Sequence, residues 1–158
     1  MDEKAKKHTL RLIPYGLYVL TARTEDGVRA ATVSWLTQAS FDPPRIAAGL
    51  RRETGIWHAV REAGAFVVNV LGSDQKALAS TFFRHTKPGE DPLHGALTHE
   101  GVTGALILDE VPAYLECRVV QVVDAGDHTL FVADIVEAGV RDDRDALSLP
   151  DTGWHYGG

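Results

Sequence analysis

Apolar residues follow a period of two over the first part of the chain, which predicts β-strands. Residues 16–23 are mostly apolar on both alternating faces, as in a strand covered on both sides. Glu25-Asp26-Gly27 has the composition of a hairpin turn, and a long strand is expected over residues 28–38. Asp42-Pro43-Pro44 interrupts this pattern because proline cannot donate to a ladder, and residues 45–50 predict a further short strand.

The apolar period then changes to that of a helix. Residues 54–63 place Ile56, Ala59, Val60 and Ala63 on one face, with Thr54 as N-cap and Gly64 at the end. Residues 66–71 predict a buried strand. Ser73-Asp74 is expected to cap a second helix, whose inner face comprises Gln75, Leu78, Ala79 and Phe82.

The last part of the chain combines a loop-rich stretch with two more strands. Residues 84–104 are rich in Gly, Pro, His and Thr, which predicts a long surface loop of the kind that covers or binds ligands. Strands are expected over residues 113–123 and 128–140, with a hairpin between them. The polar residues 1–9 are expected to be loosely held, and residues 150–158 form an aromatic, glycine-rich tail.

These elements favour one mainly β domain, folded as a closed antiparallel barrel with a few short helices. A parallel βαβ sheet would need more helices between its strands. The nucleotide fingerprints G-x-G-x-x-G and G-x-x-x-x-G-K-[ST] are absent from the sequence. A nucleotide-like cofactor would therefore need a different site for its phosphate.

Composition and charge narrow the class of protein. A chain of 158 residues suits one domain that folds without disulfides or metal. The formal net charge of −6 argues against broad binding to nucleic acid, but not against a local basic pocket. The single cysteine, Cys117, lies in a strand pattern typical of a small buried residue. With neither a signal peptide nor a long apolar run, the expected location is cytoplasmic, away from membranes.

Residues 32–44 are unusual for a plain strand. They place five hydroxyl or amide side chains and Trp35 in a stretch otherwise suited to a core. Such groups beside backbone amides can bind the edge of a ring or a phosphate. From composition alone, a solvated edge strand that ends in a proline turn explains the same residues.

A second candidate site is the segment Gly49-Leu50-Arg51-Arg52-Glu53-Thr54, directly before the predicted helix. Amides at a helix N-terminus carry partial positive charge, and arginine makes forked contacts to phosphate. The segment is thus a candidate phosphate site. Two solvated arginines beside a simple helix cap remain the alternative.

Two aromatic features complete the candidates. His128, at the Gly126-Asp127-His128 hairpin, could orient a hydride donor or transfer a proton, or it could be an exposed turn residue. Phe82 and Phe83, at the end of the second helix, could stack on a ring or belong to the core. The other histidines show no ligand spacing, so no metal site is expected.

Four motifs, in their order and spacing along the chain, resemble those of a known family. The first runs from residues 31–35 through residues 40–44, and it is followed by residues 66–71, residues 126–128 and the aromatic tail. Together they are similar to the flavin reductase-like group of FMN-binding split barrels, and especially to the branch of flavoredoxins and the flavin domains of high-molecular-weight rubredoxins. The resemblance covers residues 15–156. It implies a Greek-key split barrel, a homodimer and non-covalent FMN, with FAD as an alternative.

The resemblance also implies roles for particular residues. Thr32, Val33, Ser34, Trp35 and Leu36 would line the isoalloxazine ring, and Ser40 would lie near the ribityl-phosphate. Gly49, Leu50, Arg51 and Thr54 would hold the phosphate. His128 would lie where a nicotinamide donor approaches, and Phe82 and Phe83 would belong to the flavin pocket.

The implied activity is that of an FMN-dependent oxidoreductase that accepts hydride from NADH or NADPH. The acceptor is open between free flavin, a ferric chelate and a redox partner. A non-catalytic FMN-carrying electron-transfer module and a split barrel for another ligand, such as haem, are alternatives. The polar loop 84–104 departs from the family's aromatic pattern, which leaves the choice of donor open. The sequence has no rubredoxin-type cysteine pairs, so no iron centre is expected.

Overall fold

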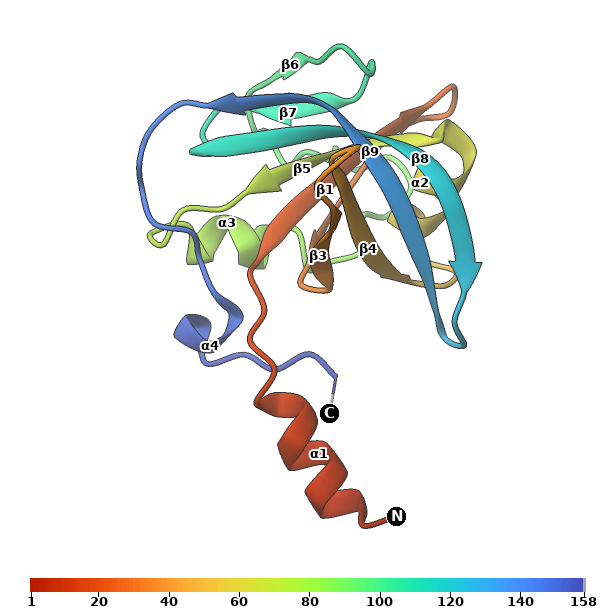
Figure 1. The fold of residues 1–158 in the computed structure, drawn as a ribbon. Helices are drawn as coiled ribbons and strands as arrows, with labels where there is room; N and C mark the ends of the chain where they lie inside the picture. Colours follow the sequence, from red (N-terminus) through yellow and green to blue (C-terminus); the bar gives the residue numbers. More distant parts are fainter. Residues whose placement is uncertain (158) are drawn as a thin grey trace.

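The computed structural model describes residues 1–157, which form a mainly β domain (Figure 1). The strands are β1 (Tyr18–Thr24), β2 (Gly27–Val33), β3 (Leu36–Ser40), β4 (Arg45–Arg51), β5 (Ala65–Val70), β6 (Thr98–Glu100), β7 (Leu106–Leu108), β8 (Ala113–Asp124) and β9 (His128–Val140). The helices are α1 (Glu3–Arg11), α2 (Gly55–Ala63), α3 (Lys76–Thr81) and α4 (Leu149–Thr152). None of the helices in this part of the chain combines the length and apolar character needed to cross a bilayer.

Seven antiparallel strands form one curled sheet in the order β2-β1-β5-β8-β9-β4-β3. The hairpins predicted at Glu25-Asp26-Gly27 and at residues 124–127 are confirmed as the β1–β2 and β8–β9 turns. The single strand predicted over residues 28–38 is wrong. The chain leaves β2 after Val33 and enters β3 at Leu36, because β2 pairs with β1 and β3 pairs with β4 at the opposite edge. Within residues 1–157 no ladder joins these edges, so the sheet is split there.

The main core lies inside the curl of the sheet and beneath α2. Phe66 and Phe131 are fully buried there with side chains from β1, β4 and β5. The predicted helix over residues 54–63 is confirmed, with Thr54 as its N-cap and Gly64 in the left-handed conformation at its end. Cys117 is also buried, and burial raises the pKa of its thiol to about 12, which makes it inert at neutral pH.

Asn69 joins the small β6–β7 hairpin to the main sheet. Its side-chain amide donates to the Val19 carbonyl at 3.0 Å and accepts from the Leu108 N–H at 2.8 Å. Strand β6 of this hairpin, residues 98–100, lies inside the stretch 84–104 that the sequence predicted as one long loop. The irregular segment before the hairpin is therefore shorter than predicted.

The second helix begins later than its predicted cap. Ser73 and Asp74 lie in a turn, and Gln75 occupies the N-cap position without a capping bond from its side chain. The Gln75 side chain instead accepts from the Gly72 N–H and donates to the Glu110 carbonyl, while Asp74 pairs with Arg144. The turn is thus fixed by distant residues, which a local capping pattern does not reveal.

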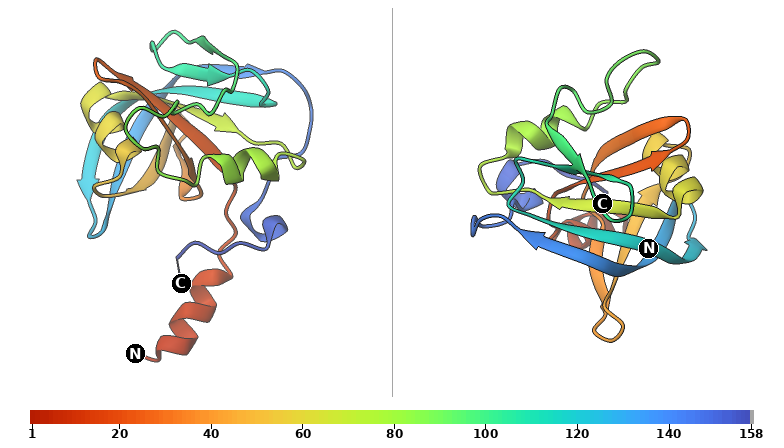
Figure 2. Two further views of the ribbon diagram at one scale, coloured as in Figure 1. Left: turned by 180° about the vertical axis from the view of Figure 1, so that it is seen from behind. Right: turned by 90° about the horizontal axis from the view of Figure 1, so that it is seen from above.

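The N-terminal segment forms helix α1, which projects from the sheet and buries none of its residues (Figures 1 and 2). The sequence predicted a loose segment there. Local interactions explain the helix: the Asp2 carboxylate accepts from the N–H groups of Lys4 and Ala5, and Glu3 pairs with Lys6 one turn on.

Candidate functional site

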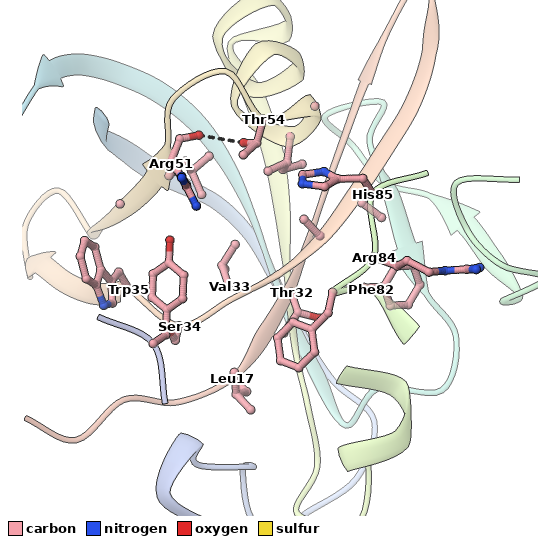
Figure 3. Close-up of a pocket in the computed structure, with 18 of the residues that line it drawn as sticks. Leu17, Thr32, Val33, Ser34, Trp35, Arg51, Thr54, Phe82, Arg84 and His85 are labelled. Carbon is pink, nitrogen blue, oxygen red and sulfur yellow. Dashed lines mark hydrogen bonds between the residues drawn. The ribbon is translucent and has the colours of Figure 1, made fainter. Parts of the chain in front are cut away.

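A cavity of about 390 Å³ opens where β2, β4 and the start of α2 meet the segment 82–86 and the tail. Its volume lies in the usual range for small-molecule sites. Figure 3 shows its two ends: Arg51, Thr54 and His85 gather at one, and apolar or aromatic side chains surround the other. The cavity is thus suited to an elongated ligand with an aromatic and an anionic part.

The chain crosses from one sheet edge to the other at Ser34 and Trp35, which form part of the cavity wall. The Trp35 carbonyl accepts from the Gly49 N–H at 2.8 Å, which fixes the crossing against β4. A Cβ on residue 49 would lie 3.3 Å from two Trp35 carbon atoms. Glycine therefore allows the indole to lie close to the β4 backbone.

Two polar side-chain atoms in this wall lack partners. The Ser34 hydroxyl and the Trp35 indole N–H are buried without a hydrogen bond in the described structure. Unpaired buried groups of this kind are uncommon and often mark a place that a ligand completes. Thr32 differs, because its hydroxyl donates to the Ala79 carbonyl at 2.7 Å and fastens α3 to β2.

The start of α2 forms the polar end of the cavity. The Thr54 hydroxyl accepts from the Trp57 N–H at 3.3 Å and donates to the Arg51 carbonyl at 2.8 Å, the bond dashed in Figure 3. The His58 N–H bonds to the Thr54 carbonyl, whereas the N–H groups of Gly55 and Ile56 have no partner among residues 1–157. A helix start with free amides is an intrinsic site for an anion.

Cationic side chains surround this helix start. Arg51 lies at the end of β4, and Arg29 reaches across from β2 to Gly55, where a Cβ would be in ordinary contact with Arg29 Cδ at 3.5 Å. His85 points toward Thr54, whereas Arg84 extends outward (Figure 3). Arginine beside free helix amides is the donor set that phosphate prefers.

His128 lies beside Arg51, its partner in the β4–β9 register. Its ring packs on Trp35 with centroids 4.4 Å apart. Its Nδ1 lies 2.8 Å from Asp127 and its Nε2 lies 2.7 Å from the Tyr156 hydroxyl. The hydrogen bond with His128 lowers the pKa of Asp127, whereas burial raises the pKa of Tyr156.

The structure brings most of the residues predicted for the site together. The cavity is lined by Thr32, Val33, Ser34, Trp35, Gly49, Leu50, Arg51, Thr54, Phe82 and Phe83. His128 is not part of the lining but contacts its wall through Trp35. Phe82 is buried, and Phe83 is half exposed against Trp154 with ring centroids 4.8 Å apart.

Besides His128, two predicted residues lie outside the lining. Leu36 packs against the main core, and Ser40 is paired with Arg45 at the far end of β3. Both lie past the crossing, where the chain has turned away from the cavity. Their roles in ligand binding stay predictions.

Sequence reasoning missed several lining residues. Arg29, Gly55 and His85 at the polar end, and Trp154 and Tyr156 from the tail, also line the cavity. The glycine-rich aromatic composition of the tail was a signal for the last two. Arg29 sits in an ordinary strand pattern, so nothing local distinguishes it. Among residues 1–157, no cluster of three or more metal-ligating side chains occurs.

The sequence matches the family described as "Flavin reductase like domain" over residues 10–156. The chain belongs to this family. The chain is similar to the reductase component of a 4-nitrophenol 4-monooxygenase/4-nitrocatechol 2-monooxygenase from Rhodococcus opacus, with 37% identity over 87% of this chain and 72% of the relative. An FMN reductase (NADH) from Agrobacterium fabrum is 30% identical over 89% of this chain and 79% of its own length.

Other similarities define the branch and the fold. The chain is 30% identical to diflavin flavoprotein A 1 of Synechocystis, of which it spans only 22%, and this supports the flavoredoxin branch of the family. The NADH:FAD oxidoreductase of Streptomyces globisporus C-1027 superposes with a TM-score of 0.84 at 24% identity, over 93% of this chain and 88% of that one. The fold is thus that of the flavin reductase-like family, and the chain is a flavin reductase-like oxidoreductase.

Thr54 is expected to contribute to stability through its cap. Thr54→Ala should lower the free energy of unfolding by about 1 kcal/mol, because the Trp57 N–H loses its partner. Thr54→Ser, which keeps the hydroxyl, is the control and should retain most of that stability. Urea unfolding measures both variants; an alanine variant as stable as the wild type would contradict the capping role.

Proposed function

We propose that the protein is a flavin reductase that holds FMN in this cavity and takes hydride from NADH or NADPH. The observation that carries the proposal is the pairing of an apolar, aromatic wall with a cationic helix start in one cavity. This pairing matches a flat ring joined to a phosphate. The names of the relatives, which include an FMN reductase (NADH), support the same assignment.

At the polar end, the N–H groups of Gly55 and Ile56 and the Arg51 guanidinium would hold the phosphate. Arg29 would add a second positive charge, and His85 would add a hydrogen-bonding ring beside it. This arrangement replaces the absent glycine-rich fingerprints, because the amides come from a capped helix start. It also concentrates positive charge locally in a chain whose net charge is −6.

At the other end, Val33, Ser34 and Trp35 would line the isoalloxazine ring. The unpaired Ser34 hydroxyl and Trp35 N–H would be available to bond the polar edge of a ring once the wall opens. The flavin supplies hydride acceptance and onward electron transfer, and the protein supplies placement and electrostatics. Val33, Ser34, Trp35 and Arg51, which were predicted from the sequence for FMN, thus have a physical part in the proposal, and FAD is the alternative cofactor.

His128 would position the nicotinamide ring. It lies beside Arg51 and against Trp35, at the edge of the cavity, and Asp127 orients its ring. The names of two relatives favour NADH as the donor. The Rhodococcus relative is the reductase component of a monooxygenase, which favours reduced flavin delivered to an oxygenase as the outlet for electrons.

The proposed assembly is a homodimer in the cytoplasm. The long β8–β9 ribbon exposes Val120, Val123, Leu130 and Val136, an apolar set suited to a second copy of the chain.

Sedimentation of the purified protein should give twice the 17.2 kDa mass of the chain. Val123→Lys should produce the monomer, because it places a charge in the interface, whereas Leu12→Lys, at the exposed end of helix α1, should not. A wild-type monomer would contradict the dimer.

The test of function is reduction of bound flavin. Purified protein with FMN should show flavin absorbance bands, and NADH or NADPH added without oxygen should bleach them rapidly. Bands without fast bleaching would favour the non-catalytic electron-transfer module. A Soret band in place of flavin bands would contradict flavin binding and favour haem.

Arg51→Ala tests the phosphate end. It should weaken FMN binding roughly 10- to 100-fold, because a charge-assisted hydrogen bond is lost. Affinity for riboflavin, which has no phosphate, should be unchanged. Arg11→Ala, on the exposed helix α1, is the control. Equal losses for FMN and riboflavin would show that Arg51 acts on the ring or on folding instead.

A further inference from the structure

We propose that the tail residues Trp154–Gly157, here named the strap, form a displaceable cover that competes with the nicotinamide donor for His128. The inference rests on the proposed function in one respect, since it takes His128 as the place where the donor binds. The strap follows α4 and passes beneath the sheet (Figure 1). Its residues Trp154 to Tyr156 line the cavity.

One end of the strap is firmly anchored. Trp154 packs against an apolar cluster that includes Leu17, Phe82 and Leu149. Its ring contacts Phe83, and the Lys76 ammonium lies 5.1 Å from the ring centroid. The Trp154 N–H also donates to the Thr152 hydroxyl at 3.0 Å. All of these contacts are made by Trp154. Residues 155–157 can therefore move while Trp154 stays in place.

The outer end is held by one side-chain hydrogen bond, between Tyr156 and His128, here named the latch. The Tyr156 hydroxyl bonds to His128 Nε2 at 2.7 Å, and its ring meets Trp35 edge-on with centroids 5.3 Å apart. Within the described chain, no backbone hydrogen bond fastens residues 155–157. A segment with one side-chain bond and exposed surroundings opens at low free energy.

The latch blocks the residue that the donor needs. Asp127 engages Nδ1 of His128 and Tyr156 engages Nε2, so neither ring nitrogen is available while the strap is closed. A carboxamide could bond to His128 only after the Tyr156 hydroxyl has left. The strap and the donor therefore exclude each other at this nitrogen.

The closed strap also leaves Trp35 unsatisfied. Gly157 lies so close that a Cβ there would be 2.9 Å from Trp35 Cζ2 and 3.7 Å from Cε2, the carbon bonded to the indole nitrogen. The strap thus helps to cover the indole N–H, which is buried without a partner. Opening would expose this group to water or ligand, which favours displacement.

Two independent variants should loosen the strap. Tyr156→Phe removes the latch and keeps the ring. Gly157→Ala adds a methyl group against Trp35 at a residue whose φ of +77° already disfavours a side chain. Tyr114→Phe is the control, because Tyr114 also lies beside a histidine, His99, but outside the cavity.

Chymotrypsin cleavage after residue 156, normalised to the unfolded protein, measures opening directly. Each of the two variants, loaded with FMN, should be cleaved about two- to tenfold faster than the FMN-loaded wild type. This factor is the one expected for loss of one hydrogen bond. NAD⁺, which binds without reducing the flavin, should accelerate cleavage of the wild type. The KM for NADH should fall by a similar factor in the variants, with kcat within about twofold.

The outcomes separate the two proposals. If wild-type protein reduces its flavin with NADH but both variants keep wild-type cleavage and KM, the strap is a fixed wall and the inference is overturned. If NADH leaves the flavin oxidised and NAD⁺ leaves cleavage unchanged, the donor assignment fails and the competition with it. Faster cleavage in Tyr114→Phe would show that the assay reports general destabilisation, which also counts against the latch.

Discussion

The crossing of the chain from β2 to β3 at Ser34 and Trp35 is the constraint on which the rest of the structure depends. Consecutive strands usually pair, but here β2 and β3 lie at opposite edges of one curled sheet. The sheet is consequently split at this point, and the cavity lies beside the split. The bond from the Gly49 N–H to the Trp35 carbonyl fixes the crossing, and glycine at residue 49 makes that close approach possible.

The same strand that supports Trp35 also builds the polar end of the site. β4 ends at Arg51, turns through Glu53 at a positive φ, and enters α2 at the Thr54 cap. Its neighbour β9 starts at His128, directly across from Arg51. The phosphate site and the donor site of the proposed enzyme therefore sit at one end of a single strand pair, and distortion of that pair would affect both.

Strong local patterns allowed much of this arrangement to be predicted. The α2 helix, its two ends and the β8–β9 hairpin followed from apolar period, capping residues and turn composition, and Arg51 followed from its place before a helix. The break at Ser34 could not be predicted, because the pairing partners of β2 and β3 decide it. Arg29 was missed for the same reason, since only the fold brings it to the cavity. Leu36 and Ser40 were assigned by resemblance alone, and the crossing turns them away from it.

A crystal structure of the protein with FMN would test the central claim most directly. The account predicts the phosphate within hydrogen-bond distance of the Gly55 and Ile56 N–H groups and of Arg51, with the ring beside Ser34 and Trp35. FMN bound elsewhere, or with its phosphate away from the start of α2, would contradict the assignment of this cavity.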